Sequence, residues 1–220
     1  MRKEVRVGLA VLVMGASGSG KSTSLRNFKP EEIGVLNVAG KPLPFRSGIR
    51  TANNVGYQMI YKVLKANKLR AYVIDDSQFL MSFEEMDSKK SGFEKFNSIG
   101  HNFIGLVRSI SSITNDDTIV YFLHHTEVGD DGRIKAKTIG KLIDNHYTLE
   151  GLFSIVLLTE ADKDSYTFTT QSQGYSTAKA PMGMFEPVMD NDLKAVDDII
   201  RDYYEMKPIV DAANAAESEE

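Results

Sequence analysis

The chain has 220 residues and no cysteine, and its 30 acidic and 26 basic side chains leave a formal net charge of −4. This length suits one domain with a full hydrophobic core. The absence of cysteine excludes disulfides and thiolate metal sites, and the negative charge excludes a protein that coats nucleic acid through global basicity. No apolar stretch reaches the length of a membrane span, so we expect a cytoplasmic protein without membrane contact.

Strand and helix patterns alternate along most of the chain. We predict strands at residues 7–14, 33–38, 71–75, 118–123, 152–159 and 166–170. We predict helices at 22–28, from a cap at Thr51 or Asn53 to about 68, at 93–113, and from a cap at Asp190 or Asn191 to 203. Segments 40–48 and 171–187 read as loops, 83–92 as a loop or frayed helix, and 127–141 as a mobile polar loop.

This order of elements predicts a three-layer α/β domain over residues 1–206. Its sheet is expected to be parallel, with antiparallel strands added at one edge. Residues 207–220 are mostly small or acidic, and we predict that they form a disordered tail.

The strongest motif lies between the first predicted strand and the first predicted helix. It reads Gly15-Ala16-Ser17-Gly18-Ser19-Gly20-Lys21-Ser22-Thr23 and satisfies the phosphate-loop pattern G-x-x-x-x-G-K-[ST]. Glycines let successive backbone N–H groups face one anion, and a helix N-terminus adds partial positive charge. We therefore expect this loop to bind a triphosphate such as ATP, with Lys21 at the β- and γ-phosphates, Ser22 at Mg²⁺ and Thr23 near the α-phosphate.

A second motif ends the predicted strand 71–75, where Asp75 and Asp76 follow an apolar run. Mg²⁺ bound to a triphosphate needs a carboxylate across from the loop serine, so Asp75 is the candidate metal ligand beside Ser22. Asp76 stands where many ATPases carry the residue that polarises the attacking water. The alternative is a buried strand that ends in a capped turn.

Strand 118–123 delivers His124 and His125 to the edge of the sheet where α/β folds place their ligands. Adjacent side chains on a strand point to opposite faces, so we expect one of the two to face the nucleotide. A hydrogen-bonded strand end is the alternative interpretation.

The polar segment after these histidines is the most concentrated basic surface of the chain. Its basic residues are Arg133, Lys135, Lys137 and Lys141. We predict that they contact the phosphates of a nucleic acid strand, and a solvated loop is the alternative.

Together these motifs resemble a known family. The phosphate loop, Val73-Ile74-Asp75-Asp76-Ser77-Gln78, Phe122-Leu123-His124-His125 and Tyr175-Ser176-Thr177-Ala178-Lys179-Ala180-Pro181 look like the phage-encoded nucleotide-binding proteins of the RecA-like ATPase superfamily. These are the Sak-type single-strand annealing recombinases. The resemblance extends from about residue 5 to about residue 190, and its first two motifs are the specific ones.

The resemblance implies a P-loop NTPase with a RecA-like core, in the host cytoplasm, that binds ATP and Mg²⁺ and promotes annealing or recombination on single-stranded DNA. Such proteins assemble as rings or filaments. The composition of the acidic tail suits a contact with a single-strand-binding protein, and a solubilising tail is the alternative. The implied roles make His125 the γ-phosphate sensor, residues 126–147 the DNA-binding loop, and Lys179 a lysine inserted into the neighbouring subunit's ATP site. The implied catalytic set is Lys21, Asp76, His125 and Lys179.

The chain departs from RecA-type enzymes at two points. Those enzymes place a catalytic glutamate after the second strand, where this chain has Asn37, and they carry a long N-terminal helix where only six residues precede the first predicted strand. The first departure makes Asp76 a surrogate and predicts slow hydrolysis, and the second leaves the mode of assembly open. Two other functions stay open: an AAA-type ATPase that loads or remodels a replication protein, and a slow nucleotide switch that binds a protein partner.

Overall fold

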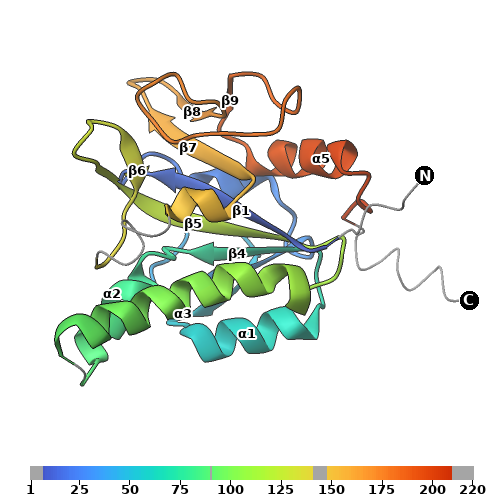
Figure 1. The fold of residues 1–220 in the computed structure, drawn as a ribbon. Helices are drawn as coiled ribbons and strands as arrows, with labels where there is room; N and C mark the ends of the chain where they lie inside the picture. Colours follow the sequence, from blue (N-terminus) through green and yellow to red (C-terminus); the bar gives the residue numbers. More distant parts are fainter. Residues whose placement is uncertain (1–6, 90, 141–147, 210–220) are drawn as a thin grey trace, which may run out of the picture.

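The computed structural model describes residues 7–89, 91–140 and 148–209. Within these ranges nine strands form one sheet in the order β3-β2-β4-β5-β1-β7-β8-β9, and β6 pairs with β5 (Figure 1). The strands are β1 (Leu9–Gly15), β2 (Ile33–Asn37), β3 (Arg50–Asn53), β4 (Ala71–Asp75), β5 (Ile119–Val128), β6 (Ile134–Ala136), β7 (Ile155–Ala161), β8 (Tyr166–Thr169) and β9 (Val188–Asp190). The helices are α1 (Tyr57–Ala66), α2 (Phe79–Asp87), α3 (Gly92–Ile113) and α5 (Leu193–Tyr203), with the short 3₁₀ helices η1 (Ser22–Asn27) and η2 (Leu149–Leu152).

The sheet is mostly parallel. Strands β3, β2, β4, β5, β1 and β7 run parallel to their neighbours, and β8 and β9 add to the β7 side as antiparallel strands. Every residue of β4 is buried, as is expected for a parallel strand covered on both faces. The predicted α/β class, with a largely parallel sheet and antiparallel strands at one edge, is therefore confirmed.

Helices cover both faces of the sheet. In Figure 1, α1, α2 and α3 lie below the sheet and α5 lies above it. Alternate residues of β1 enter the two cores, Leu12 below and Val13 above. None of the helices in the described ranges combines the length and the apolarity that a membrane span requires.

The prediction for residues 51–56 is wrong, because the expected helix starts later. Residues 50–53 form β3, which pairs in parallel with β2, and α1 begins at Tyr57 after Gly56. Pairing with the edge of β2 gives these backbone groups partners that a helix start would leave open. The helix also ends earlier than predicted, since Asn67 adopts the left-handed conformation with φ of 47°.

Two segments, one predicted as a loop or frayed helix and the other as a mobile loop, contain regular secondary structure. Most of the segment 83–92 belongs to α2 and to the start of α3, and α2 buries Leu80 and Met81. The segment 127–141 begins as the end of β5 and returns as β6, with Val128 paired to Ile134. Apolar and polar residues alternate on both sides of the turn from Gly129 to Gly132, and this pattern is typical of a hairpin. The charged residues of the segment led the sequence analysis to predict a loop instead.

The first and the last predicted helices also differ in detail from the structure. The helix after the phosphate loop is η1, a six-residue 3₁₀ helix, so its dipole is a smaller source of positive charge than the sequence analysis assumed. The cap of α5 is Asp192, not Asp190 or Asn191, because the Asp192 carboxylate accepts bonds from Lys194 N and Ala195 N. Residue 190 belongs to β9 instead.

The inner face of α5 is fixed to the sheet by a buried ion pair. Arg201 Nε lies 2.5 Å from Asp197 Oδ2, and Tyr121 Oη donates to Asp197 Oδ1 at 2.8 Å. The guanidinium also donates to the carbonyls of Asp117 and Lys207. Burial raises the pKa of Asp197, although Arg201 opposes this shift.

Residues 207–209 contact the body of the domain, since Arg70 Nη1 donates to Pro208 O at 2.6 Å. The rest of the predicted tail, 210–220, lies outside the described residues.

We expect Arg201→Met to lower the free energy of unfolding by about 3–5 kcal/mol, because it leaves the Asp197 carboxylate buried without its cation. Urea denaturation of parent and variant measures the loss. The matched control is Lys194→Met on the same helix, which removes the more exposed pair with Asp198 and should cost about 1 kcal/mol or less. Equal losses in the two variants would contradict this assignment.

Candidate phosphate-binding site

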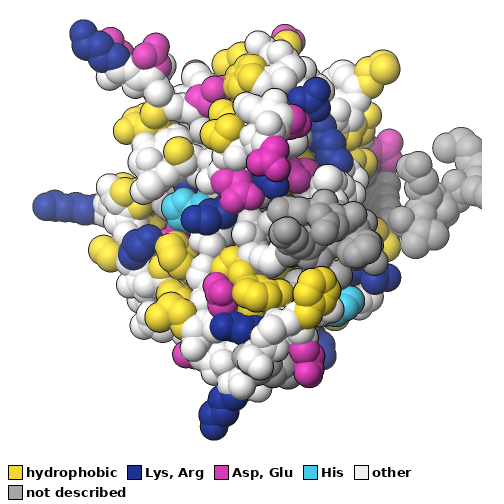
Figure 2. Space-filling view, turned by 60° about the vertical axis from the view of Figure 1, so that its left-hand side comes forward, with side chains coloured by type: hydrophobic (Ala, Val, Ile, Leu, Met, Phe, Trp, Pro, Cys, Tyr) yellow, Lys and Arg dark blue, Asp and Glu magenta, His cyan; other side chains and the backbone are white. Residues whose placement is uncertain are grey.

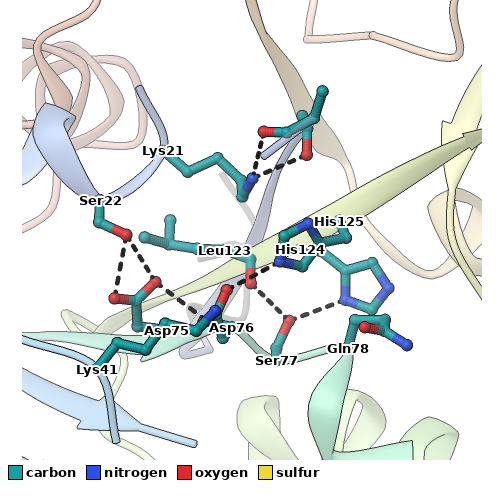
Figure 3. A network of polar contacts seen from close by, with 12 residues as sticks. Lys21, Ser22, Lys41, Asp75, Asp76, Ser77, Gln78, Leu123, His124 and His125 are labelled. Atoms are coloured by element: carbon teal, nitrogen blue, oxygen red, sulfur yellow. Dashed lines mark hydrogen bonds and ion pairs between the residues drawn. The ribbon is translucent and has the colours of Figure 1, made fainter. Parts of the chain in front are cut away.

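The topology brings the predicted site residues to one edge of the sheet. Strand β5 lies between β1 and β4, and all three are parallel, so their carboxyl ends meet. The register pairs Gly15 at the start of the phosphate loop with His125 on β5. Figure 3 shows the resulting cluster, in which Lys21 and Ser22 lie opposite Asp75, Asp76 and the two histidines.

The phosphate loop has the backbone shape that its glycines permit. Gly18 and Gly20 have φ of 80° and 95°, a region that other residues rarely adopt. A Cβ on Gly15 would lie 1.9 Å from Thr159 Oγ1, so β7 packs directly against the loop. Thr159 Oγ1 also hydrogen-bonds with Ser19 Oγ. The sequence analysis gave Ser19 no separate role within the loop. The loop therefore has a fixed shape supported from the neighbouring strand.

A buried side chain with open hydrogen-bonding capacity lies beside this loop. A Cβ on Gly20 would lie 2.8 Å from the Tyr166 ring and 3.3 Å from Asn191 Nδ2. Within the described ranges, neither polar atom of the Asn191 side chain has a hydrogen-bond partner. The sequence analysis considered Asn191 only as a helix cap and did not connect Tyr166 with the loop, because Tyr166 begins β8 and Asn191 follows β9, both far along the chain.

Lys21 lies within the loop and is almost fully buried. Its Nζ donates to Gly15 O and Ala16 O, each at 2.8 Å. Burial lowers the pKa of Lys21 to about 8, against the opposing attraction of Asp76 and Asp75. The ammonium is thus charged at neutral pH but poorly solvated, which favours a bound anion.

Ser22 and Asp75 contact each other directly, although 53 residues separate them. Ser22 Oγ donates to both carboxylate oxygens of Asp75, at 3.0 and 3.1 Å. Burial and the nearby Asp76 raise the pKa of Asp75, and the Ser22 hydrogen bond opposes the shift. A hydroxyl and a carboxylate side by side are the oxygen ligands that Mg²⁺ takes together with substrate phosphates, so these two residues fit the ion. Thr23 follows on η1, half-buried.

Asp76 has a left-handed backbone conformation, with φ of 56°, directly after β4. Its carboxylate contacts His125 Nε2 at 3.0 Å and Lys41 Nζ at 2.9 Å. Burial disfavours the charged form, but the hydrogen bonds from His125 and Lys41 outweigh it and lower the pKa of Asp76 to about 2. A carboxylate held in this way is a weak proton acceptor, so the catalytic role expected from the sequence needs at least one of these partners to leave.

Sequence reasoning missed Lys41, which comes from the loop after β2. Asn37 ends β2 and shapes this loop, since its side-chain amide donates to Lys41 O and accepts from Gly40 N at 2.9 Å. Asn37 stands where RecA-type enzymes place a glutamate, and its amide fixes the backbone of Lys41, whose ammonium lies beside Asp76. No sequence motif marks Lys41, and only the pairing of β2 with β4 brings it near.

The two histidines contact different groups, as the alternation along a strand predicts. His124 is fully buried, with Nδ1 2.8 Å from Ser77 Oγ and Nε2 2.8 Å from Lys137 O. Because a carbonyl can only accept, Nε2 carries the hydrogen. Burial lowers the pKa of His124 to about 4. His125, in contrast, contacts Asp76 and the edge of the Phe79 ring.

Two of the three described basic residues that are predicted to bind nucleic acid lie beside acidic side chains. In the hairpin, Lys135 Nζ lies 3.3 Å from Glu127 Oε1, and Arg133 Nε lies 3.7 Å from Asp131 Oδ2. Lys137 is exposed at the base of β6, and Lys141 lies outside the described residues. Figure 2 shows Lys and Arg side chains scattered among acidic ones on this face.

Lys179 is not part of the cluster. Its backbone pairs with Val156 of β7, with hydrogen bonds of 2.9 and 2.7 Å, and its side chain is exposed. A contact with the nucleotide of a neighbouring subunit is a proposal that this exposed position permits.

Two observations delimit the site further. Across the described ranges, no group of three or more His, Cys, Asp or Glu side chains could hold a metal ion by itself, so the pair formed by Ser22 and Asp75 needs phosphate oxygens and water to complete Mg²⁺ coordination. A groove of about 570 Å³ beside β2, β3 and α1 and a hollow of about 500 Å³ beside Asp117 contain none of the cluster residues.

No protein-family model matches the sequence, and no curated protein matches it either.

We expect the buried His124 to make stability fall in mild acid. Its pKa is about 4 in the folded chain and about 6.5 when exposed, so the stabilisation is complete above pH 6.5 and is lost as the pH falls towards 4. The difference is on the order of 3 kcal/mol. Urea midpoints between pH 4 and 7 measure it, and His124→Gln should flatten the slope.

The control for this measurement is His101→Gln on the exposed side of α3, which should keep the parent slope. If His124→Gln and His101→Gln show the same pH dependence as the parent, the buried neutral histidine is not the cause.

Proposed function

We propose that this chain is an ATP-dependent recombination protein that binds ATP with Mg²⁺, hydrolyses it slowly, and binds single-stranded DNA during annealing or recombination. The observation that carries the proposal is the contact of Ser22 with Asp75, opposite the ammonium of Lys21. It supports a triphosphate site because one pocket then combines anion-binding backbone, a buried cation and a pair of hard oxygen ligands.

The residues of the site have separate roles in this proposal. Loop residues 15–23 bind the phosphates through backbone N–H groups, and Lys21 exchanges its carbonyl partners for phosphate oxygens. Ser22 and Asp75 hold Mg²⁺, which when bound neutralises charge on the β- and γ-phosphates. The fixed loop and the Asp75 carboxylate then set the position of the terminal phosphate relative to Asp76.

Hydrolysis needs a water that attacks the γ-phosphorus. In this proposal the water, oriented by the carboxylate of Asp76, forms a bond to phosphorus while the bond to the bridging oxygen of ADP breaks, and one proton of the water is released to solvent. The hydrogen bond from His125 and the ion pair with Lys41 weaken Asp76 as a base, which supports slow turnover.

The coupling to DNA runs through the β5–β6 hairpin. Its base is tied to the site twice, because His124 donates to Lys137 O and Lys137 N donates to His125 O at 2.8 Å. A change of partner at His125 would therefore act on the residues that carry Lys135 and Lys137. Assembly as a ring or filament would place several hairpins along one DNA strand.

Calorimetry of ATP with Mg²⁺ tests the core of the proposal. We expect binding to the parent chain, and a loss of affinity of at least tenfold in Lys21→Met and Asp75→Asn, because each removes a charged partner of the nucleotide or its ion. The control is Lys62→Met on the exposed face of α1, which should bind as the parent does. No heat from ATP with the folded parent chain would overturn the proposal.

The salt dependence of DNA binding tests the second part. Each phosphate contact that is removed lowers the slope of log K against log [salt] by about 0.7 for a single strand, so Lys135→Ala with Lys137→Ala should flatten it by about 1.4. Fluorescence anisotropy with single-stranded oligonucleotides measures the slope. If the double variant binds like the parent at every salt concentration, the hairpin is not the DNA contact.

The other two functions give different results in the same solutions. An ATPase that loads a replication protein would be stimulated by that protein and would bind DNA poorly, and a nucleotide switch would bind ATP with negligible turnover. Hydrolysis rates with and without single-stranded DNA separate these outcomes.

A further inference from the structure

We propose that Lys41 is a catalytic residue of this site, and that its ammonium exchanges Asp76 for the terminal phosphate of bound nucleoside triphosphate. This inference rests on the proposed function, because it assigns a residue to the same triphosphate site. The inference goes beyond the proposed function because Lys41 belongs neither to the phosphate-loop motif nor to the motif at the end of β4.

The first argument is the position of Lys41. Its Nζ lies 2.9 Å from Asp76 Oδ2, and Asp76 directly follows Asp75, which contacts Ser22. The charge of Lys41 also acts on Lys21, whose pKa it lowers. Figure 3 shows the two lysines extending into the cluster from opposite sides of Asp75. Lys41 is therefore near the place where the end of a triphosphate chain bound to the loop would lie.

The second argument is that the backbone of Lys41 is fixed while its side chain is open. Asn37 bonds Lys41 O and Gly40 N, and it also donates to Asn53 Oδ1 at 3.1 Å, so three segments are tied together. The Lys41 side chain is 61% exposed. A change of partner then needs only rotation of the side chain, with no movement of the loop.

The third argument is the balance of charge. Lys21 and Lys41 balance Asp75 and Asp76 in the cluster, and an ammonium between a carboxylate and a more highly charged phosphate favours the phosphate. The γ-phosphate is present in a triphosphate and absent from a diphosphate. Contact with Lys41 therefore discriminates between the two, and it also removes one of the two partners of Asp76, the carboxylate that orients water.

In the reaction Lys41 stabilises charge and keeps its proton. A water oxygen forms the bond to the γ-phosphorus while the bond to the bridging oxygen breaks and its electron pair leaves with ADP. One proton of the water stays on the inorganic phosphate and the other is released to solvent. The ammonium acts on the phosphoryl oxygens during this transfer, as cationic side chains do in other phosphoryl-transfer sites.

The test compares ATP and ADP affinities, measured by calorimetry with Mg²⁺, in the full chain and its variants. Lys41→Ala should weaken ATP by about 10-fold to 100-fold and change ADP by less than about twofold, because one charged hydrogen bond to the γ-phosphate is lost. Its hydrolysis rate at saturating ATP should fall by at least tenfold. Lys62→Ala, an exposed lysine on α1, should behave as the parent in all three measurements.

A second variant separates this role from a structural one. Asp76→Asn removes the competing carboxylate and should keep or increase the preference for ATP over ADP, although it slows hydrolysis. If Lys41 served only to hold Asp76, both variants would shift the ATP and ADP affinities alike.

The outcomes are distinct. If Lys41→Ala leaves the ratio of ATP affinity to ADP affinity unchanged, this inference is overturned and the proposed function stands. Failure of the parent chain to bind ATP contradicts the proposed function and this inference with it.

Discussion

The contact between Ser22 and Asp75 is the interaction on which the site depends. It joins Ser22 of the phosphate loop to Asp75 at the end of β4, across the width of β5, which lies between β1 and β4 in the sheet. Adjacent strands lie about 4.8 Å apart, so two strand spacings separate the end of β1 from the end of β4. Ser22 covers this distance because it lies on the loop beyond the carboxyl end of β1. The shape of the loop, fixed by Gly20 and Thr159, is thus part of the same constraint.

Charge compensation is the second constraint, because four charged side chains lie close together and three of them are largely shielded from solvent. Asp76 is stabilised in its ionised form by Lys41 and His125, whereas Asp75 has a hydroxyl as its partner and a raised pKa. The two carboxylates therefore differ in whether a cationic side chain contacts them directly. Asp75 gains most from a divalent cation, and Asp76 is already neutralised by groups that the chain supplies. This difference supports a metal-side role for the first and a reaction-side role for the second.

The sequence was sufficient for the parts of the site that are local. Residues 15–23 and the pair Asp75 and Asp76 follow from motifs, and buried parallel strands follow from continuous apolar runs. It was insufficient where the partner is distant. Lys41 reaches Asp76 only through the β2–β4 pairing, and β3 forms because the edge of β2 is available, so neither has a signal within its own segment. The hairpin at 126–136 was missed because charged residues masked a short two-residue alternation.

The position of β5 explains how a change at the site could reach the surface that is proposed to bind DNA. His125 contacts Asp76 on one face of the strand, and His124 holds Lys137 O on the other, so the same strand end is bonded to the site and to the returning β6. A ligand alters this arrangement only to the extent that it binds one partner state better than the other. A triphosphate that attracted Lys41 would remove one of the two side chains that contact Asp76 and would leave the contact with His125. In the proposed function a change at that contact would reach the hairpin base, because Lys137 N donates directly to His125 O.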